Sequence, residues 1–205
     1  GLGLPDVPYY DKPEYQKIRD AYVAYISRML ELSGIPAADA AAQAKGVLAF
    51  ETRLAKVSKS REALARDVGL YYNPISPAEA DKLSPNFPFT KLFESQGVAV
   101  PAMFSLSVPA YHAEVSKMLG DVPAAQWKSY LRFHLLDGAA PYLSNDFVQA
   151  NFEFYGKTLG GQKELRERGK RVLGTIDGQV GEALGQMYVK VAFPAESKAK
   201  METLL

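Results

Sequence analysis

Apolar side chains recur every three or four residues along most of this chain, and this spacing restricts the fold more than any other feature of the sequence. The clearest run is Tyr15, Ile18, Tyr22, Ile26 and Met29. Residues at this spacing lie on one face of an α-helix, so the run predicts a helix with one apolar face. Comparable spacing continues through residues 36–57, 109–119, 123–141, 144–161 and 162–191.

Polar and glycine residues mark the expected helix ends. Gly34 follows the first run, as glycine commonly does at a helix C-terminus. Asp11 is expected to cap the start of that helix, with Pro13 in its first turn. Ser76 and Glu79 have the Ser-x-x-Glu spacing of a capping box, which predicts another helix start.

Strand signals are sparse. Residues 102–108 alternate between two faces, which predicts a strand whose partner the sequence does not identify. Residues 70–74 are expected to be extended, because residues that precede a proline avoid the helical region. We therefore predict an all-α fold of about seven to nine helices with at most one small β element, as a single helical segment over residues 1–205.

The helix expected over residues 123–141 carries a specific prediction about burial. Trp127, Leu131 and Leu135 recur at a spacing of four, so we expect them to be buried on one face. Lys128 and Arg132 are expected to be more exposed.

Composition excludes several classes of chemistry. Cysteine is absent, which removes disulfides, thiolate metal sites and Cys nucleophiles. The 24 Lys and Arg residues balance 23 Asp and Glu residues, and the net charge of +1 gives no electrostatic case for a nucleic-acid partner. Apolar residues at 47% and charged residues at 23% are typical of a globular protein.

The two histidines lack the pattern of a zinc site. Neither His112 nor His134 begins a His-Glu-x-x-His motif, in which two histidines share a helix face beside a glutamate that activates water. We expect His134 to be a core histidine on an apolar helix face and His112 to be solvated at the surface. The sequence therefore assigns no metal ligand and no catalytic residue in this chain.

Other motifs are absent or weak. No Gly-x-Ser-x-Gly nucleophile motif occurs. The glycines within 156–161 follow a helix, which favours a helix terminator over a phosphate loop. Glu164 and Glu167 lie among basic residues at 166–171, a run that favours a solvated face with ion pairs over a nucleic-acid patch. The aromatic residues within 147–155 favour a core stripe over a ligand pocket.

The two ends of the chain lead us to expect a segment of a longer protein. The sequence starts at Gly1, with no charged-then-apolar leader, so a signal peptide is either absent or removed. Residues 194–205 indicate a helix that runs to the end without a cap. No window approaches 18 consecutive apolar residues, so we expect no membrane span.

Several strings follow the order found in one enzyme family. GLGLPD at 1–6 with Tyr-Tyr at 9–10, and WKSYLRFHLL at 127–136, resemble the neprilysin and endothelin-converting-enzyme family of zinc metallopeptidases. The resemblance continues through FEFYGKTLGGQ at 152–162 and VGEALGQMYVKVAFPAESKAKM at 180–201. Shorter matches lie at 21–26, 51–54, 66–67, 72–73 and 141–144.

The residues that carry this resemblance are expected to have structural roles rather than catalytic ones. They are Gly3, Leu4, Pro5, Tyr9, Tyr10, Trp127, Arg132, Phe154, Tyr155, Gly156, Tyr188, Phe193, Glu196, Ser197 and Lys198.

The resemblance implies a function and a setting. The chain is similar to the middle of the family's helix-rich N-terminal domain, a lid that encloses the active-site chamber and admits only small peptides. It implies that one zinc ion is held by the catalytic domain of the same polypeptide and that peptides are the substrates. No metal is expected in this chain, and the implied compartment is periplasmic or extracellular. Gly169 and Val172 depart from the family, whose members usually carry Trp and often Cys there.

A self-standing all-α interaction domain without a protease remains the alternative. A His-Glu-x-x-His motif downstream in the parent gene would favour the lid. If the chain is one segment of a lid, the isolated segment exposes apolar surface that the rest of the lid covers in the whole protein. We expect association through the terminal helix, with Met201, Leu204 and Leu205 as anchors.

Overall fold

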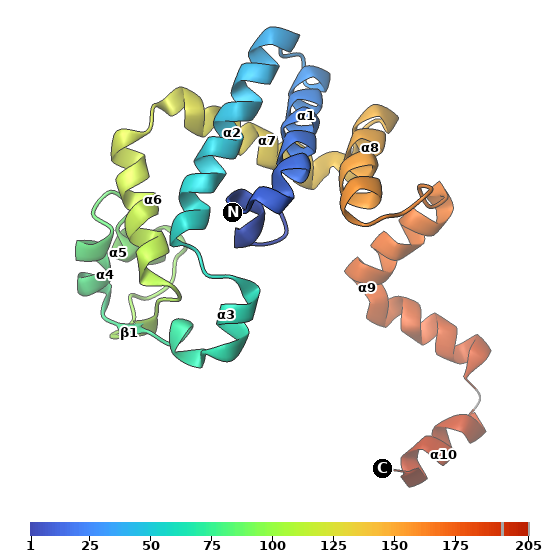
Figure 1. The fold of residues 1–205 in the computed structure, drawn as a ribbon. Helices are drawn as coiled ribbons and strands as arrows, with labels where there is room; N and C mark the ends of the chain where they lie inside the picture. Colours follow the sequence, from blue (N-terminus) through green and yellow to red (C-terminus); the bar gives the residue numbers. More distant parts are fainter. Residues whose placement is uncertain (194, 205) are drawn as a thin grey trace. The chain divides into compact units, whose positions relative to one another are not determined.

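The computed structural model describes residues 1–193 and 195–204 and confirms the all-α class, with 74% of the chain helical. The chain divides into two compact units, Gly1–Gln162 and Lys163–Leu205, each described by itself (Figure 1). The α-helices of the first unit are α1 Gln16–Leu32, α2 Ala37–Val57, α3 Arg61–Arg66, α4 Pro77–Leu83, α5 Phe89–Ser95, α6 Pro109–Asp121, α7 Ala124–Ala139 and α8 Asn145–Asn151. The unit also contains the π-helix η5 Phe152–Leu159 and the 3-10 turns η1 Val7–Tyr10, η2 Pro13–Tyr15, η3 Val68–Leu70 and η4 Ala140–Tyr142.

Helices α1 and α2 lie side by side and form the centre of the first unit (Figure 1). A short turn joins them, and Gly34 in this turn has a φ of +93°, which a residue with a side chain rarely adopts. Tyr22 and Ile26 of α1 and Ala40 and Ala44 of α2 are fully buried. The small alanines leave room for close packing of the two helices, while the other face of the alanine-rich stretch is exposed.

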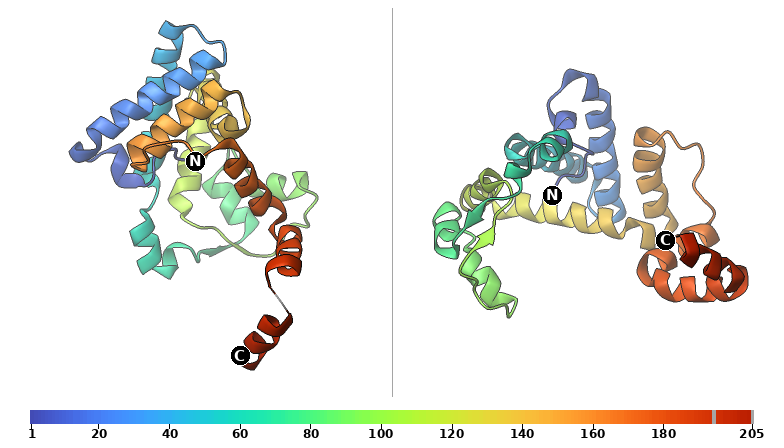
Figure 2. Two further views of the ribbon diagram at one scale, coloured as in Figure 1. Left: turned by 90° about the vertical axis from the view of Figure 1, so that its right-hand side faces the viewer. Right: turned by 90° about the horizontal axis from the view of Figure 1, so that it is seen from below.

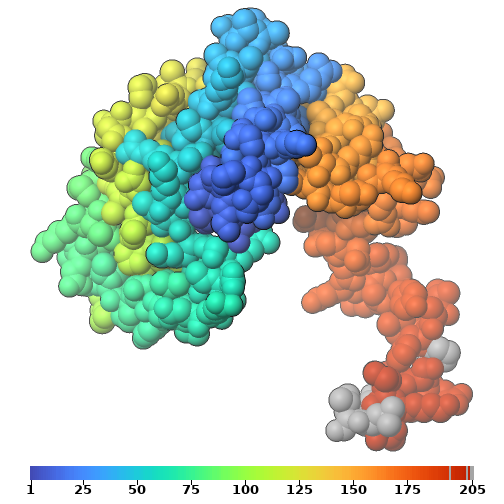
Figure 3. Space-filling model, in the orientation of Figure 1, coloured from blue at the N-terminus to red at the C-terminus, as the bar shows by residue number. Residues whose placement is uncertain are grey.

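Helices α7 and α8 complete this core. α7 packs on α2, and α8 and η5 pack on α1. The views of Figure 2 show α8 running beside α1. In Figure 3 the N-terminal segment, dark blue, lies on the surface of the unit next to the cyan α2. The first residues also reach α7, because the Tyr130 hydroxyl donates to the Gly1 carbonyl at 2.8 Å.

A smaller cluster surrounds the two-stranded β element. β1 Pro74–Ile75 pairs antiparallel with β2 Phe104–Ser105, with Pro74 opposite Ser105 and Ile75 opposite Phe104. Ala80, Phe89 and Leu106 form its buried centre. The capping box of α4 is confirmed, because the Ser76 side chain accepts from the Glu79 amide and the Glu79 carboxylate accepts from the Ser76 amide.

Two local predictions were wrong. The 70–74 segment is not extended throughout, because Leu70 ends η3 and Tyr71 has helical angles; the strand β1 begins only at Pro74. Asp11 does not cap α1, because the 3-10 turn at Pro13–Tyr15 precedes that helix, which begins at Gln16. The 3-10 turn therefore separates Asp11 from the first turn of α1, so the Asp11 side chain does not cap that helix.

The predicted burial of Leu131 and Leu135 on α7 was also wrong, whereas Lys128 is exposed as expected. Leu131 is 57% exposed and Leu135 is 73% exposed, whereas Trp127 and Arg132 are intermediate. The buried line runs instead through Tyr130 and Phe133. Helix α7 carries apolar side chains on most of its faces. The spacing of these residues therefore does not show which face packs on α1 and α2.

The second unit contains α9 Arg168–Ala192 and α10 Ala195–Leu204. α9 starts later than residue 162, and Val180 interrupts its helical backbone with φ −136° and ψ 33°. Its apolar side chains are largely exposed, including Val180 at 53% and Tyr188 at 66%. Met201 is 55% exposed, whereas Leu205 and the side chain of Leu204 lie outside the described residues. Within the described ranges no helix meets the length and hydropathy that a membrane crossing requires.

Candidate functional site

A buried carboxylate on α2 is the centre of the first unit's polar structure. Glu51 is 0% exposed, and four groups lie within hydrogen-bond distance of its carboxylate. The hydroxyls of Tyr10 and Tyr22 lie 2.6 and 2.9 Å from its oxygens. The Gly3 amide donates at 3.1 Å, and His134 Nε2 lies 2.8 Å from Oε1. Four other parts of the fold, namely the N-terminal segment, η1, α1 and α7, therefore contact this one side chain of α2.

The backbone of the N-terminal segment forms hydrogen bonds with these side chains. Besides the Gly3 bond to Glu51, the Leu4 amide donates to the Tyr10 hydroxyl at 2.9 Å. The Tyr155 hydroxyl donates to the Gly3 carbonyl at 3.2 Å. A Cβ on residue 3 would come within 1.9 Å of the Tyr22 hydroxyl oxygen, so only glycine permits this close approach. The helical core thus recognises backbone groups of the segment that precedes η1.

A second carboxylate, Asp137 on α7, joins α1 to the π-helix. It accepts from the Tyr25 hydroxyl at 2.5 Å and from the Tyr155 hydroxyl at 3.2 Å. Asn151 donates to the Tyr25 hydroxyl at 3.0 Å. Tyr155 therefore connects this carboxylate with the N-terminal segment, and through it with Glu51. We call the two carboxylates and the hydroxyl, histidine and backbone amide groups that bind them the carboxylate network.

Burial shifts the acid–base properties of the network. Burial raises the pKa of Asp137, while hydrogen bonds from Tyr25 and Tyr155 lower it in part. The pKa values of Tyr10 and Tyr22 are raised by burial and by the neighbouring charge of Glu51. These phenols therefore remain protonated donors across the physiological range.

The geometry gives the carboxylate network an anchoring role. Both carboxylates are occupied by donors from the chain itself. In the described part of the chain, no three His, Cys, Asp or Glu side chains come together as a metal-binding group. Buried polar groups that are fully satisfied stabilise one arrangement of the surrounding helices.

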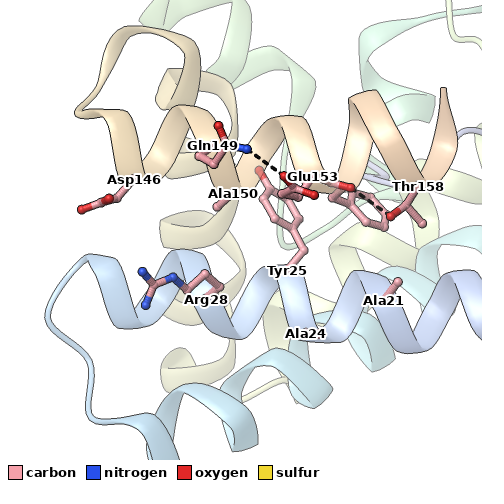
Figure 4. A pocket seen from close by; sticks show the side chains of 10 residues that line it. Ala21, Ala24, Tyr25, Arg28, Asp146, Gln149, Ala150, Glu153 and Thr158 are labelled. Atoms are coloured by element: carbon pink, nitrogen blue, oxygen red, sulfur yellow. Dashed lines mark hydrogen bonds between the residues drawn. The ribbon is translucent and has the colours of Figure 1, made fainter. Parts of the chain in front are cut away.

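A groove lies beside the network, between α1 and the helical stretch formed by α8 and η5 (Figure 4). It has a volume of about 430 Å³, and its lining combines small apolar side chains, Ala21, Ala24 and Ala150, with polar and charged ones such as Arg28 and Glu153. Tyr25 belongs both to this wall and to the carboxylate network. Tyr25 is therefore the residue that joins the wall of the groove to Asp137.

The π-helix forms one side of that groove. The Thr158 hydroxyl donates to the Glu153 carbonyl at 2.9 Å, and Gln149 donates to the Glu153 carboxylate at 2.7 Å, as the dashed lines of Figure 4 show. A Cβ at Gly156 would approach a Phe152 ring carbon to 2.3 Å. π-helical turns are rare and often occur at functional positions.

The structure brings some of the sequence-predicted residues together. Gly3, Tyr10 and Tyr155 belong to the carboxylate network, and Phe154 packs against Tyr22 and Tyr25 with centroids 5.2 and 5.1 Å away. Leu4 is buried, Pro5 is half-buried, Tyr9 stacks on Tyr15, Trp127 stands edge-on to Phe50, and Gly156 lies against Phe152.

The remaining motif residues lie outside the network. Arg132 is half-buried on α7. In the second unit, Tyr188 is exposed, Phe193 and Ser197 are intermediate, Lys198 is exposed, and Glu196 pairs with Lys200 at 3.2 Å.

The two histidines differ from each other. His134 is a core histidine paired with Glu51, as expected. His112 was predicted to be solvated, which was wrong, because its half-buried ring stands edge-on to Phe89. Burial lowers the pKa of His112, partly offset by a hydrogen bond with the Ser107 backbone.

Sequence reasoning missed Glu51 and Asp137 as sites. A signal for Glu51 existed, because it follows Val47 and precedes Leu54 by four and three residues, on the apolar face of α2. A carboxylate on a buried face requires donors. The Tyr and Gly partners lie far away in sequence, and no local pattern reveals them.

The class that the structure defines is an all-α protein whose first unit is held together around two carboxylates, Glu51 and Asp137. The family model described as Peptidase family M13, in its N-terminal part, matches residues 1–205. The chain belongs to peptidase family M13, which confirms the resemblance seen in the sequence.

Individual relatives support this assignment. The chain is 29% identical to "Endothelin-converting enzyme-like 1" of Mus musculus, over 100% of this chain and 27% of that protein. It is 27% identical to "Neutral endopeptidase" of Lactobacillus helveticus, over 98% of this chain and 31% of that protein. The chain thus spans about a quarter to a third of the relatives it matches.

Solved structures show the same fold. The zinc metalloprotease ZMP1 of Mycobacterium tuberculosis in its open state matches with a TM-score of 0.87 and 31% identity, over 100% of this chain and 32% of that chain. PEPO from Lactobacillus rhamnosis HN001 matches with a TM-score of 0.84 and 25% identity, over 99% of this chain and 32% of that chain.

Proposed function

We propose that this chain is part of a lid that encloses the active-site chamber of a zinc metalloendopeptidase and restricts its substrates to oligopeptides. The observation that carries the proposal is the match of residues 1–205 to the N-terminal part of the M13 family. The same match favours a lid over a self-standing interaction domain, because it spans the whole chain.

Peptide hydrolysis is proposed for the intact protein, not for this segment alone. The relatives' names, neutral endopeptidase and zinc metalloprotease, point to peptide substrates and to one zinc ion. The residues present do not fit that ion, because none of the described His, Asp and Glu side chains form a group of ligands. We assign zinc to the catalytic domain of the same polypeptide, which is the segment's main partner. A periplasmic or extracellular location follows from the same relationship.

The contacts of the first unit suit a steric role. A wall that excludes folded proteins must keep its shape, and the carboxylate network joins the N-terminal segment, α1, α2, α7 and η5 through side-chain hydrogen bonds. The motif residues Gly3, Tyr10, Phe154, Tyr155 and Gly156 are proposed to maintain this packing. None is proposed to touch the reacting peptide bond.

The test uses the full-length protein that contains this segment. Rates of hydrolysis are measured for one cleavage sequence placed in a short peptide, in a long unfolded peptide and in a surface loop of a folded protein. The lid predicts rapid cleavage of the short peptide and little cleavage of the folded protein. Equal kcat/KM for all three substrates would contradict it.

A variant assigns the effect to this segment. Asp137→Ala removes the acceptor of Tyr25 and Tyr155 and is expected to raise cleavage of the long substrate relative to the short one. Glu62→Ala is the matched control, because Glu62 is 70% exposed and, among the described residues, pairs only with Arg66 in its own helix. Unfolding is monitored by circular dichroism, so that loss of the fold is distinguished from loosening of the lid.

A further inference from the structure

A second cavity in the first unit combines an apolar interior with a positive rim. It has a volume of about 450 Å³ and lies where the N-terminal segment, the start of α3 and the start of α6 meet. We call it the N-terminal cavity. It is separate from the groove of Figure 4, with which it shares no lining residue.

The rim carries two cations without partners of their own. Lys59 and Arg61 are both exposed, and in the described ranges their side chains make no hydrogen bond or ion pair. Asp6 is the carboxylate in the lining of the cavity. Its oxygens already accept hydrogen bonds from the Val7 amide at 2.7 Å and from the Arg61 amide at 3.2 Å. A ligand's negative charge therefore meets two free cations and one engaged carboxylate.

The interior is apolar. Leu2, Leu4 and Leu64 contribute aliphatic surface, and Tyr111 contributes an aromatic wall. Ligand sites combine such an apolar interior with a few placed polar groups, which fix the orientation of the ligand.

The wall nearest α6 is held in a strained conformation. Val108 has φ 48° and ψ 69°, a left-handed conformation that is unusual for a β-branched residue. Its amide donates to the Leu70 carbonyl at 3.2 Å, and its carbonyl accepts from the Tyr111 amide at 2.9 Å. Strain of this kind persists only where surrounding contacts enforce it, and it gathers at binding sites.

His112 adds a neutral polar group to the same wall. Burial lowers its pKa, so the imidazole is uncharged at pH 7 and offers a hydrogen bond rather than a third positive charge. The titratable and charged side chains of the lining are thus Asp6, Lys59, Arg61, Tyr111 and His112.

We propose that the N-terminal cavity binds a carboxylate carried on an apolar body, with the carboxylate at Lys59 and Arg61 and the apolar part against the leucines. The C-terminal end of a peptide and a medium-chain fatty acid share this chemistry. The proposal goes beyond the lid function and does not depend on peptide hydrolysis.

The test is an NMR titration of the full 205-residue chain with two probes, N-acetyl-L-leucine and octanoate. At least one probe is expected to shift the Leu64, Val108 and His112 signals with a Kd on the order of 1 mM. Its uncharged counterpart, N-acetyl-L-leucinamide or octanol, is expected to bind at least about tenfold more weakly. Binding of the first probe alone identifies a peptide terminus, and binding of octanoate alone identifies a fatty acid.

Variants assign the binding to the rim. The double variant Lys59→Gln/Arg61→Gln is expected to weaken the acid about tenfold. Lys56→Gln is the control, because Lys56 is exposed at the end of α2 and does not line the cavity. No shift of the three signals with either probe, equal binding of acid and uncharged counterpart, or wild-type affinity in the double variant would each overturn the proposal.

Discussion

Glu51 lies on the buried face of α2, where the other side chains are apolar. The Glu51 carboxylate is held there by hydrogen bonds rather than by apolar contacts. A buried charge without donors is costly, but here Tyr10, Tyr22, His134 and the Gly3 amide surround it. The residue thus stabilises the fold only as long as all its partners stay in place.

Replacement of Glu51 by alanine is expected to destabilise the chain strongly. The Tyr10 and Tyr22 hydroxyls and the Gly3 amide would lose their acceptor, and an unsatisfied buried donor costs about 1–3 kcal/mol. We expect the free energy of unfolding in urea to fall by about 3 kcal/mol or more. The exposed control Glu62→Ala should change it by less than about 0.5 kcal/mol. A loss as small as the control's would show that the network is not an anchor.

Asp137 predicts a pH dependence of stability. Its pKa is raised in the folded chain, mainly by burial and also by the charge of Glu51, whereas Tyr25, Tyr155 and His134 lower it in part. The folded state therefore binds the proton more tightly than the unfolded state does. The stability that this group contributes is fully present below the unfolded pKa of about 3.9 and is lost as the pH rises through the folded pKa.

Asp137→Asn isolates this effect. The variant cannot ionise at this position, so the free energy of unfolding of wild type minus that of the variant is expected to decrease from about pH 3 to pH 7. Urea unfolding of both proteins in the same buffers measures it, because contributions of other groups cancel in the difference. A difference that grows with pH would mean that the folded state favours the carboxylate.

Among the elements, those with strong local signals are the ones that the sequence predicts well. The capping box at Ser76 and Glu79 sets the start of α4, and Gly34 sets the end of the α1 region. The face of α7 was not predictable, because Leu131 and Leu135 are as apolar as the residues that are buried. The carboxylate network depends on pairs such as Gly3 with Glu51, which come together only in the folded chain.

The π-helix yields an element-scale prediction. Gly156→Ala places a methyl group against the Phe152 ring, so overpacking is expected to cost about 1–3 kcal/mol although alanine favours helices. Gly138→Ala on α7 is the control, because its Cβ would meet nothing within 4 Å and should stabilise the helix by about 1 kcal/mol. Thermal unfolding of the two variants compares them. Equal stabilisation by both would contradict the close packing at the π-helix.

At the scale of the whole molecule, the division into two units predicts where proteases act first. The boundary falls between Gln162 and Lys163, and Lys163 and Arg166 are trypsin sites on the non-helical stretch before α9. Limited trypsin digestion followed by mass spectrometry is expected to cut there first and to leave a resistant N-terminal fragment. An earlier cut within α1, α2 or α7 would contradict this division.

Our central proposal is that this chain, which belongs to peptidase family M13, is a non-catalytic segment and that zinc is bound by another part of the polypeptide. The most direct measurement is zinc content after dialysis together with peptide hydrolysis, for the 205-residue chain and for the full-length protein. We predict one zinc ion and chelator-sensitive hydrolysis in the full-length protein, and neither in the 205-residue chain, since a catalytic zinc requires about three protein ligands. One equivalent of zinc with chelator-sensitive hydrolysis in the 205-residue chain would contradict the account.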